Sequence, residues 1–169
     1  MTTRIGINGF GRIGRTFLRA ALANDADIEV VAVNDLTDVE TLADLLEWDS
    51  ISGHLDGVSA QGDHLSVKGR DITVLSQRDP SAIPWGEVGA DVIIESTGRF
   101  TSTDAARAHL SGGARKVIVS APASGDAPAL VLGVNTDSLD VAAHDVFSNG
   151  SCTTNCLAPM VKVLNDAFG

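Results

Sequence analysis

A cysteine begins an expected helix near the end of the chain, in the run Ser151-Cys152-Thr153-Thr154-Asn155-Cys156. The free N–H groups and the positive dipole at a helix N-terminus favour a thiolate, the form of cysteine that attacks a carbonyl carbon. We therefore predict that Cys152 is a catalytic nucleophile rather than a small buried apolar residue. The hydroxyls of Ser151 and Thr153, together with the same N–H groups and Cys152, could hold the substrate, an oxyanion or an inorganic phosphate.

The second cysteine, Cys156, falls one turn further into the helix, and we expect it to be structural, with its thiol deeper in the protein. Two cysteines four residues apart, with no third or fourth ligand nearby in the sequence, do not make a closed zinc site, so no metal is predicted. A cysteine nucleophile commonly takes its base from a histidine. None of the histidines is well placed by the sequence, and each is expected to be structural or on the surface: His54, His64, His109 and His144.

A glycine-rich turn near the N-terminus, Gly9-Phe10-Gly11-Arg12-Ile13-Gly14, matches the G-x-G-x-x-G pattern of a dinucleotide-binding site. It follows an apolar strand and opens a helix, which is the context that this pattern requires. Gly9 permits the tight turn, Gly11 lets the backbone approach a pyrophosphate, and Gly14 lets the helix pack closely on the strand. The alternative is that these glycines only shape a turn.

An acidic residue, Asp35, ends the second strand about twenty residues beyond that turn. Its carboxylate can accept hydrogen bonds from both adenosine ribose hydroxyls and would repel a 2′-phosphate, so NAD is favoured over NADP. Arg78 could reach an adenine, although a solvated loop arginine fits the sequence equally well. The residues predicted to bind the cofactor are Asn8, Gly9, Phe10, Gly11, Arg12, Ile13, Asn34, Asp35, Arg78, Ser96, Thr97, Gly98 and Ser120.

The elements that must position these residues alternate between strands and helices, which predicts an α/β fold with a doubly wound, mainly parallel sheet. Alternating polar and apolar residues between His54 and Leu75 predict a small antiparallel meander in place of one crossover helix. In the last helix the apolar residues recur at helical spacing, so we expect it to be largely buried. Expected strands cover residues 4–8, 28–34, 71–75, 91–96, 116–120, 130–133 and 145–148, and expected helices cover residues 12–23, 38–47, 103–110 and 152–168.

Composition limits the class of partner. Lys and Arg number 12 against 22 Asp and Glu, and the resulting net charge of −10 disfavours nucleic acid and anionic lipid surfaces. No apolar run approaches the roughly 18 residues that a membrane span needs. The N-terminus shows no signal-peptide pattern, and the sparse cysteines fit a reducing compartment. We expect a cytoplasmic protein without a membrane or nucleic-acid partner.

With both motifs in place, the whole chain resembles the N-terminal half of the phosphorylating glyceraldehyde-3-phosphate dehydrogenases. The run that contains Cys152 is the most specific part of this resemblance. The matching runs are Ile7-Asn8-Gly9-Phe10-Gly11-Arg12-Ile13-Gly14-Arg15, Val33-Asn34-Asp35-Leu36, Glu95-Ser96-Thr97-Gly98-Arg99-Phe100, Ser120-Ala121-Pro122-Ala123 and Ser148-Asn149-Gly150-Ser151-Cys152-Thr153-Thr154-Asn155-Cys156.

The resemblance implies a Rossmann NAD-binding domain over residues 1–150 and the first helix of a catalytic domain over residues 151–169. It also implies a homotetrameric glycolytic enzyme. In that family the thiolate at the position of Cys152 adds to the aldehyde of glyceraldehyde 3-phosphate, and a hydride leaves for NAD. Inorganic phosphate then cleaves the thioester to give 1,3-bisphosphoglycerate. The family's base is a histidine roughly thirty residues beyond the cysteine, past Gly169, so the chain is expected to be a fragment that is inactive alone.

Two positions depart from the family pattern: Gly150, where alanine is usual, and Ser124, where lysine is common. Neither change removes a catalytic group. Two alternatives remain open at this point. Erythrose-4-phosphate dehydrogenases share much of the pattern, and the chain could also be a truncated NAD-binding or interaction module without turnover.

Overall fold

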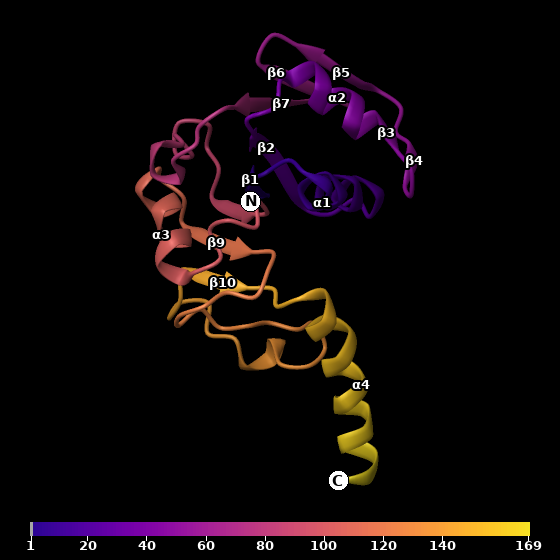
Figure 1. The fold of residues 1–169 in the computed structure, drawn as a ribbon, viewed down its shortest axis with the longest axis vertical. Coiled ribbons are helices and arrows are strands. Elements are labelled where there is room, and N and C mark those ends of the chain that lie inside the picture. The colour runs from indigo at the N-terminus through magenta and orange to yellow at the C-terminus, as the bar shows by residue number, and fades with distance from the viewer. Residues whose placement is uncertain (1) are drawn as a thin grey trace.

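A single sheet forms the centre of the computed structural model, in which residues 2–169 are described (Figure 1). Within the described residues the sheet has eight strands in the order β10-β9-β8-β1-β2-β7-β6-β5. The strands from β10 to β7 run parallel, and β6 and β5 continue the sheet in antiparallel pairs. The strands are β1 (Thr3–Asn8), β2 (Ile28–Asn34), β5 (Val58–Gln61), β6 (His64–Val67), β7 (Arg70–Leu75), β8 (Val92–Glu95), β9 (Lys116–Val119) and β10 (Val146–Ser148).

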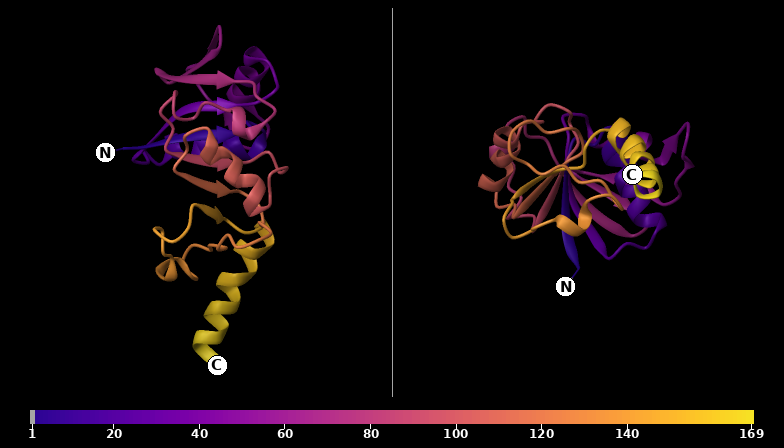
Figure 2. Two further views of the ribbon diagram at one scale, coloured as in Figure 1. Left: turned by 90° about the vertical axis from the view of Figure 1, so that its left-hand side faces the viewer. Right: turned by 90° about the horizontal axis from the view of Figure 1, so that it is seen from below.

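Helices cover both faces of the sheet, which makes the domain a three-layer, doubly wound fold (Figures 1 and 2). Apolar residues of α1 and α2 share one buried cluster with Ile5, Ile7 and Val33, and Ala106 of α3 shares a second cluster with Trp85. The helices are α1 (Arg12–Ala23), α2 (Val39–Glu47), α3 (Thr103–Ser111) and α4 (Cys152–Phe168), with 3-10 turns η1 (Pro80–Ala82) and η2 (Thr136–Ser138). The predicted fold class and mainly parallel sheet are confirmed.

The predicted elements agree with the observed ones except at their ends and in one region. The expected meander is present as β5, β6 and β7, while a separate two-stranded sheet is formed by β3 (Trp48–Asp49) and β4 (Gly53–His54). The strand expected at residues 130–133 is wrong. Only Ala129 bridges to β10, at Ser148, and the side chain of Asn135 then accepts a hydrogen bond from the Val131 N–H, which folds the segment into a turn.

The expected burial of α4 is also wrong. The helix stands away from the rest of the domain (Figure 2), and none of its residues is buried. Its apolar side chains Leu157, Val161 and Leu164 are each more than half exposed. Their spacing is that of a packed helix, but no element of the described residues lies against this face. Sequence periodicity identifies an apolar stripe without showing what covers it.

Within residues 2–169, no helix is long and apolar enough to cross a bilayer.

One glycine in β1 determines how the sheet packs on its α3 face. A Cβ atom on Gly6 would lie 2.6 Å from Cζ3 of Trp85 and 2.8 Å from Cδ1 of Ile93. Both neighbours are fully buried, so neither can move aside without disturbing the core. The indole of Trp85 therefore packs directly on the backbone of β1.

We expect Gly6→Ala to lower the free energy of unfolding by about 3 kcal/mol, because overpacking forces rigid buried groups to shift. Gly11→Ala is the matched control, since nothing lies within 4 Å of the added methyl group. The control should change stability by less than about 1 kcal/mol. Urea unfolding followed by circular dichroism measures both variants, and equal stability of the two would contradict the packing argument.

Candidate functional site

A cleft lies where β1, β2 and β8 end, at the carboxyl edge of the parallel sheet. Its volume is about 430 Å³, the size of a small-molecule site. Ligands of open α/β sheets bind at this edge, where neighbouring strands lead to helices on opposite faces. The cleft is lined by Asn8, Gly9, Gly11, Asn34, Asp35, Leu36, Gln77, Arg78, Ser96, Thr97, Arg99 and Phe100.

The glycine-rich turn shapes one wall of the cleft through three different constraints. Gly9 has a φ of +87°, and a Cβ atom there would lie 2.7 Å from the Thr97 nitrogen, so only glycine fits. A Cβ atom on Gly14 would collide with the carbonyl oxygen of Gly9, which confirms the close packing predicted for the helix on the strand. Gly11 instead borders open space in the cleft, at the start of α1. The free N–H groups there suit an anionic group.

Asp35 ties the end of β2 to this turn. Its Oδ2 accepts a hydrogen bond from the Phe10 N–H at 2.8 Å, and its Oδ1 accepts one from the Thr37 N–H at 3.0 Å. Each carboxylate oxygen has a second lone pair, so the side chain can still accept hydrogen bonds from a ligand in the cleft. The position and charge of Asp35 therefore suit a ribose diol and oppose an added phosphate.

The two arginines beside the glycine-rich turn, Arg12 and Arg15, interact with other residues of the protein. Arg12 pairs with Asp49 of the β3–β4 hairpin at 3.6 Å, and Arg15 donates to the carbonyl oxygen of Phe10 at 2.9 Å. Burial lowers the pKa of Arg15. Hydrogen bonds from the N–H groups of Ser52 and Ile51 lower the pKa of Asp49, and Arg12 adds to that effect. Arg12 thus braces the hairpin against the turn and does not line the cleft.

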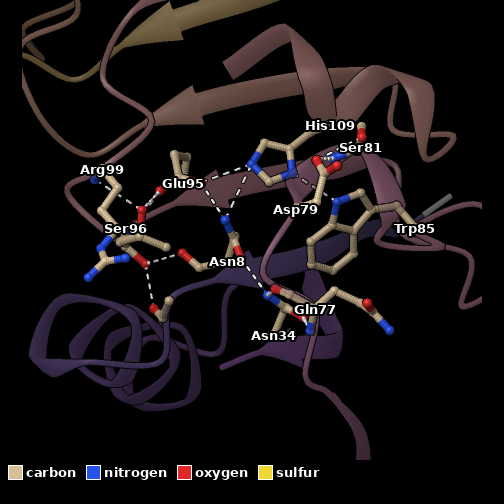
Figure 3. A network of polar contacts seen from close by, with 12 residues as sticks. Asn8, Asn34, Gln77, Asp79, Ser81, Trp85, Glu95, Ser96, Arg99 and His109 are labelled. Carbon is tan, nitrogen blue, oxygen red and sulfur yellow. Dashed lines mark hydrogen bonds and ion pairs between the residues drawn. The ribbon is translucent and has the colours of Figure 1, made fainter. Parts of the chain in front are cut away.

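Two buried polar side chains, Asn8 and Asn34, line the cleft and are hydrogen-bonded to a network that continues beneath it (Figure 3). Asn34 donates to Oδ1 of Asn8 at 2.8 Å, and Asn8 donates to Oε2 of Glu95 at 2.6 Å. Oε1 of Glu95 accepts a hydrogen bond from the backbone N–H of Thr97 at 2.8 Å and another from its hydroxyl. The ends of three neighbouring strands are joined by these contacts.

The predicted cofactor residues divide into two sets. Those that line the cleft are Asn8, Gly9, Gly11, Asn34, Asp35, Arg78, Ser96 and Thr97. Those that lie outside its lining are Phe10, Arg12, Ile13, Gly98 and Ser120. Phe10 is buried in the core and offers its N–H to Asp35, whereas Ile13 is 54% exposed on α1.

Sequence reasoning missed four lining residues. Leu36 and Gln77 are adjacent in the sequence to the predicted residues Asp35 and Arg78, and this adjacency was a signal that they could line the same cleft. Arg99 and Phe100 belong to the turn after β8, where only the first three positions were predicted. A strand end shows where a cleft is, but the path of the following loop decides which side chains reach it.

The predicted nucleophile begins α4. Ser151 caps the helix by accepting a hydrogen bond from the Thr154 N–H at 2.9 Å, and its hydroxyl also contacts those of Thr153 and Thr154. Ser151, Cys152 and Thr153 therefore lie together at the helix start, as predicted. Cys152 and Cys156 are both exposed. The expectation of a deeper Cys156 thiol is wrong, because nothing in the described residues covers α4.

The histidines lie in surface or structural surroundings. His54 contacts Glu47 at 2.9 Å and stacks on Trp48, whereas His64 lies between Asp63 and Asp71. His144 makes an edge contact with Phe147. The fourth, His109, is fully buried beside Glu95 and Trp85.

Within residues 2–169, no three or more His, Cys, Asp or Glu side chains lie together in a way that could hold a metal ion.

Comparison with known proteins gives one consistent result. Residues 3–103 match the family model described as glyceraldehyde 3-phosphate dehydrogenase, NAD binding domain. Glyceraldehyde-3-phosphate dehydrogenase of Geobacillus stearothermophilus is 58% identical over 100% of this chain and 50% of its own length. The Streptomyces coelicolor enzyme is 56% identical, over 100% of this chain and 51% of its own length. The chain therefore spans about half the length of the curated relatives it matches.

Gly11→Ala should weaken NAD binding by at least roughly tenfold, because the added methyl group would occupy space in the cleft that a pyrophosphate needs. Its stability should be close to that of the wild type, since the methyl group meets no protein atom within 4 Å. Calorimetric titration with NAD measures the Kd. Unchanged affinity would show that the dinucleotide does not approach Gly11.

Proposed function

Because the chain belongs to the glyceraldehyde-3-phosphate dehydrogenase family through its NAD-binding domain, we propose that it is the cofactor-binding half of a phosphorylating dehydrogenase. The proposed reaction is oxidation of glyceraldehyde 3-phosphate with inorganic phosphate to 1,3-bisphosphoglycerate, a step of glycolysis. NAD is the cofactor of the matched domain. The observation that supports the proposal is the cleft itself, which Gly11 and Asp35 both line. We propose that a pyrophosphate binds beside Gly11 and a ribose beside Asp35.

The proposed chemistry begins at Cys152. Its thiol is exposed at the N-terminus of α4. Acting as the thiolate, the sulfur adds to the aldehyde carbon of the substrate, and the carbonyl oxygen becomes an oxyanion. NAD, when bound, would supply the hydride acceptor. As the oxyanion collapses to a carbonyl, the C–H bond of the same carbon breaks, the hydride departs, and a thioester remains on Sγ. Phosphate then attacks the thioester carbon, and the thiolate leaves as the acyl phosphate forms. The N–H groups of the first turn of α4 and the hydroxyl of Thr153 are the groups proposed to hold these anions.

We further propose that the two parts of the chain belong to different domains of the whole enzyme. Residues 1–150 would form the NAD-binding domain and residues 151–169 the start of a catalytic domain. The projection of α4 away from the sheet supports this division (Figure 2). The catalytic base would be a histidine supplied beyond Gly169, and the whole enzyme would be a cytoplasmic homotetramer.

A second candidate function is an NAD-binding or interaction module without turnover. The observation that favours it is the exposed apolar face of α4, with Phe168 exposed by 85%. An exposed face of this kind suits a protein partner. An open reading frame that continues past Gly169 and encodes a histidine roughly thirty residues after Cys152 would favour the dehydrogenase. A stop codon after Gly169 would favour the module.

The 169-residue chain should bind NAD but turn over at a rate lowered by roughly 10³-fold relative to a polypeptide that includes the proposed second half, because the proposed histidine base lies in that half. The assay follows NADH absorbance with glyceraldehyde 3-phosphate, NAD and phosphate. A parallel assay with erythrose 4-phosphate in place of glyceraldehyde 3-phosphate tests the alternative substrate. Comparable rates for the two polypeptides would contradict the need for an added base.

Iodoacetamide should label Cys152 roughly tenfold faster than Cys156, because Cys152 begins α4, where the free N–H groups of the first turn face an attacking sulfur, and Cys156 lies one turn further in. Both thiols are exposed, so access does not favour either one. The single variants Cys152→Ser and Cys156→Ser assign the two rates by mass spectrometry. Equal rates would contradict an activated nucleophile.

A further inference from the structure

A line of buried polar side chains continues from the cleft to the α3 face of the sheet (Figure 3). It comprises Asn34, Asn8, Glu95, His109 and Trp85, and we refer to these five residues as the buried relay. All five are at most 4% exposed. The relay begins at the cleft, which Asn34 and Asn8 line, and ends on the side of α3, where Trp85 packs against Gly6.

The chemistry of the groups settles the direction of each hydrogen bond at the far end. The indole Nε1–H of Trp85 can only donate, so Nδ1 of His109 is the acceptor of their 3.0 Å bond. The ring proton of His109 is then on Nε2, which donates to Oε2 of Glu95 at 2.8 Å. The side-chain amide of Asn8 donates to the same oxygen. Trp85 and Glu95 therefore both favour the Nε2–H tautomer of His109, and His109 orients the carboxylate.

The other carboxylate oxygen of Glu95 faces the cleft wall. Oε1 accepts hydrogen bonds from both the backbone N–H and the hydroxyl of Thr97, and that hydroxyl in turn accepts a bond from the N–H of Arg99. Thr97 and Arg99 line the cleft. Glu95 thus joins the buried relay to the turn that forms one wall of the cofactor site.

Burying a carboxylate, here in a residue that is 1% exposed, has a large desolvation cost and is a weak source of stability. Desolvation of such a group is compensated only when donors satisfy both oxygens, and here Asn8, His109 and Thr97 do so. An apolar pair of similar volume would pack the same space without that cost. The carboxylate instead fixes hydrogen bonds on two sides. Oε2 accepts from Asn8 and His109, and Oε1 accepts from Thr97, which lines the cleft.

We propose that Glu95 is a positioning residue for NAD, which holds the turn from Thr97 to Arg99 in its binding shape, and that His109 and Trp85 hold Glu95 in turn. This inference rests on the proposed function of the cleft as the NAD site. It gives the buried His109 a positioning role at the cofactor cleft rather than one as the base of Cys152.

The principal variant is Glu95→Gln, which keeps the size of the side chain but replaces one acceptor oxygen by a donor. That donor faces either Thr97 or the pair formed by Asn8 and His109, and one side of the relay must open. We expect the Kd for NAD to rise roughly tenfold, the effect of losing one charge-assisted hydrogen bond.

Ile93→Ala is the matched control for a loss of stability alone. Ile93 lies two residues earlier on β8, is fully buried in the cluster that contains Trp85, and has no polar group. Its truncation should lower the urea midpoint at least as much as Glu95→Gln while leaving the Kd within about twofold of the wild type. Equal weakening of NAD binding by both variants would show a merely structural role.

Trp85→Phe tests the far end of the relay and carries the test if Glu95→Gln does not fold. It removes the N–H that holds Nδ1 of His109, at a residue outside the cleft lining. We expect the Kd for NAD to rise about threefold, as for loss of one neutral hydrogen bond. Nitrogen-15 NMR should show the Nδ1 signal of His109 shifted by the loss of its donor, while the proton stays on Nε2, where the Glu95 carboxylate accepts it.

The outcomes separate the two proposals. A wild-type chain that does not bind NAD would contradict the proposed function and this inference together. A wild-type chain that binds NAD, with Glu95→Gln or a folded Trp85→Phe binding equally well, would contradict the positioning role alone. A wild-type His109 protonated on Nδ1 would also overturn it, because Trp85 would then have no acceptor.

Discussion

The buried carboxylate of Glu95 is the constraint on which this domain depends most. A charge in the interior must have hydrogen-bond donors on both oxygens, and the donors come from β1, from the turn after β8 and from α3. The requirement is met only when β1, the turn after β8 and α3 take the relative positions seen in the structure. The same contacts that satisfy the charge therefore also determine where the carboxyl edge of the sheet lies.

The wall of the cleft formed by the glycine-rich turn depends on the absence of side chains rather than on their presence. Gly9 brings the backbone against Thr97, and Gly14 brings α1 against the carbonyl oxygen of Gly9. Asp35 then accepts the N–H of Phe10 within the turn. Close backbone approach on one side and a satisfied carboxylate on the other leave a cleft bordered by N–H groups and acceptors, which is what a dinucleotide requires.

The α4 helix shows a different relation between sequence and structure. Its first turn is well anchored, because Asn155 donates to the carbonyl oxygens of Asn149 and Ser151 and Ser151 caps the helix. Beyond that turn the apolar stripe has no neighbour among the described residues. The helix therefore presents Cys152 at one end on the carboxyl side of the sheet and an uncovered apolar face along the rest of its length.

Local pattern was enough to predict most of this protein, since hydrophobic period, helix caps and a glycine-rich turn act over a few residues. The bounds of α1, β2 and α4, the parallel sheet and the place of Asp35 were all predicted in this way. The turn at residues 130–133 depends on one nearby side chain, Asn135, which hydrophobic period does not reveal. The burial of His109 beside Glu95 joins α3 to β8, and such a contact between distant residues was not predictable. The exposure of Cys156 and α4 likewise depends on what packs against them. Such features are decided by long-range packing and by the need to satisfy buried polar groups, which only the folded chain brings together.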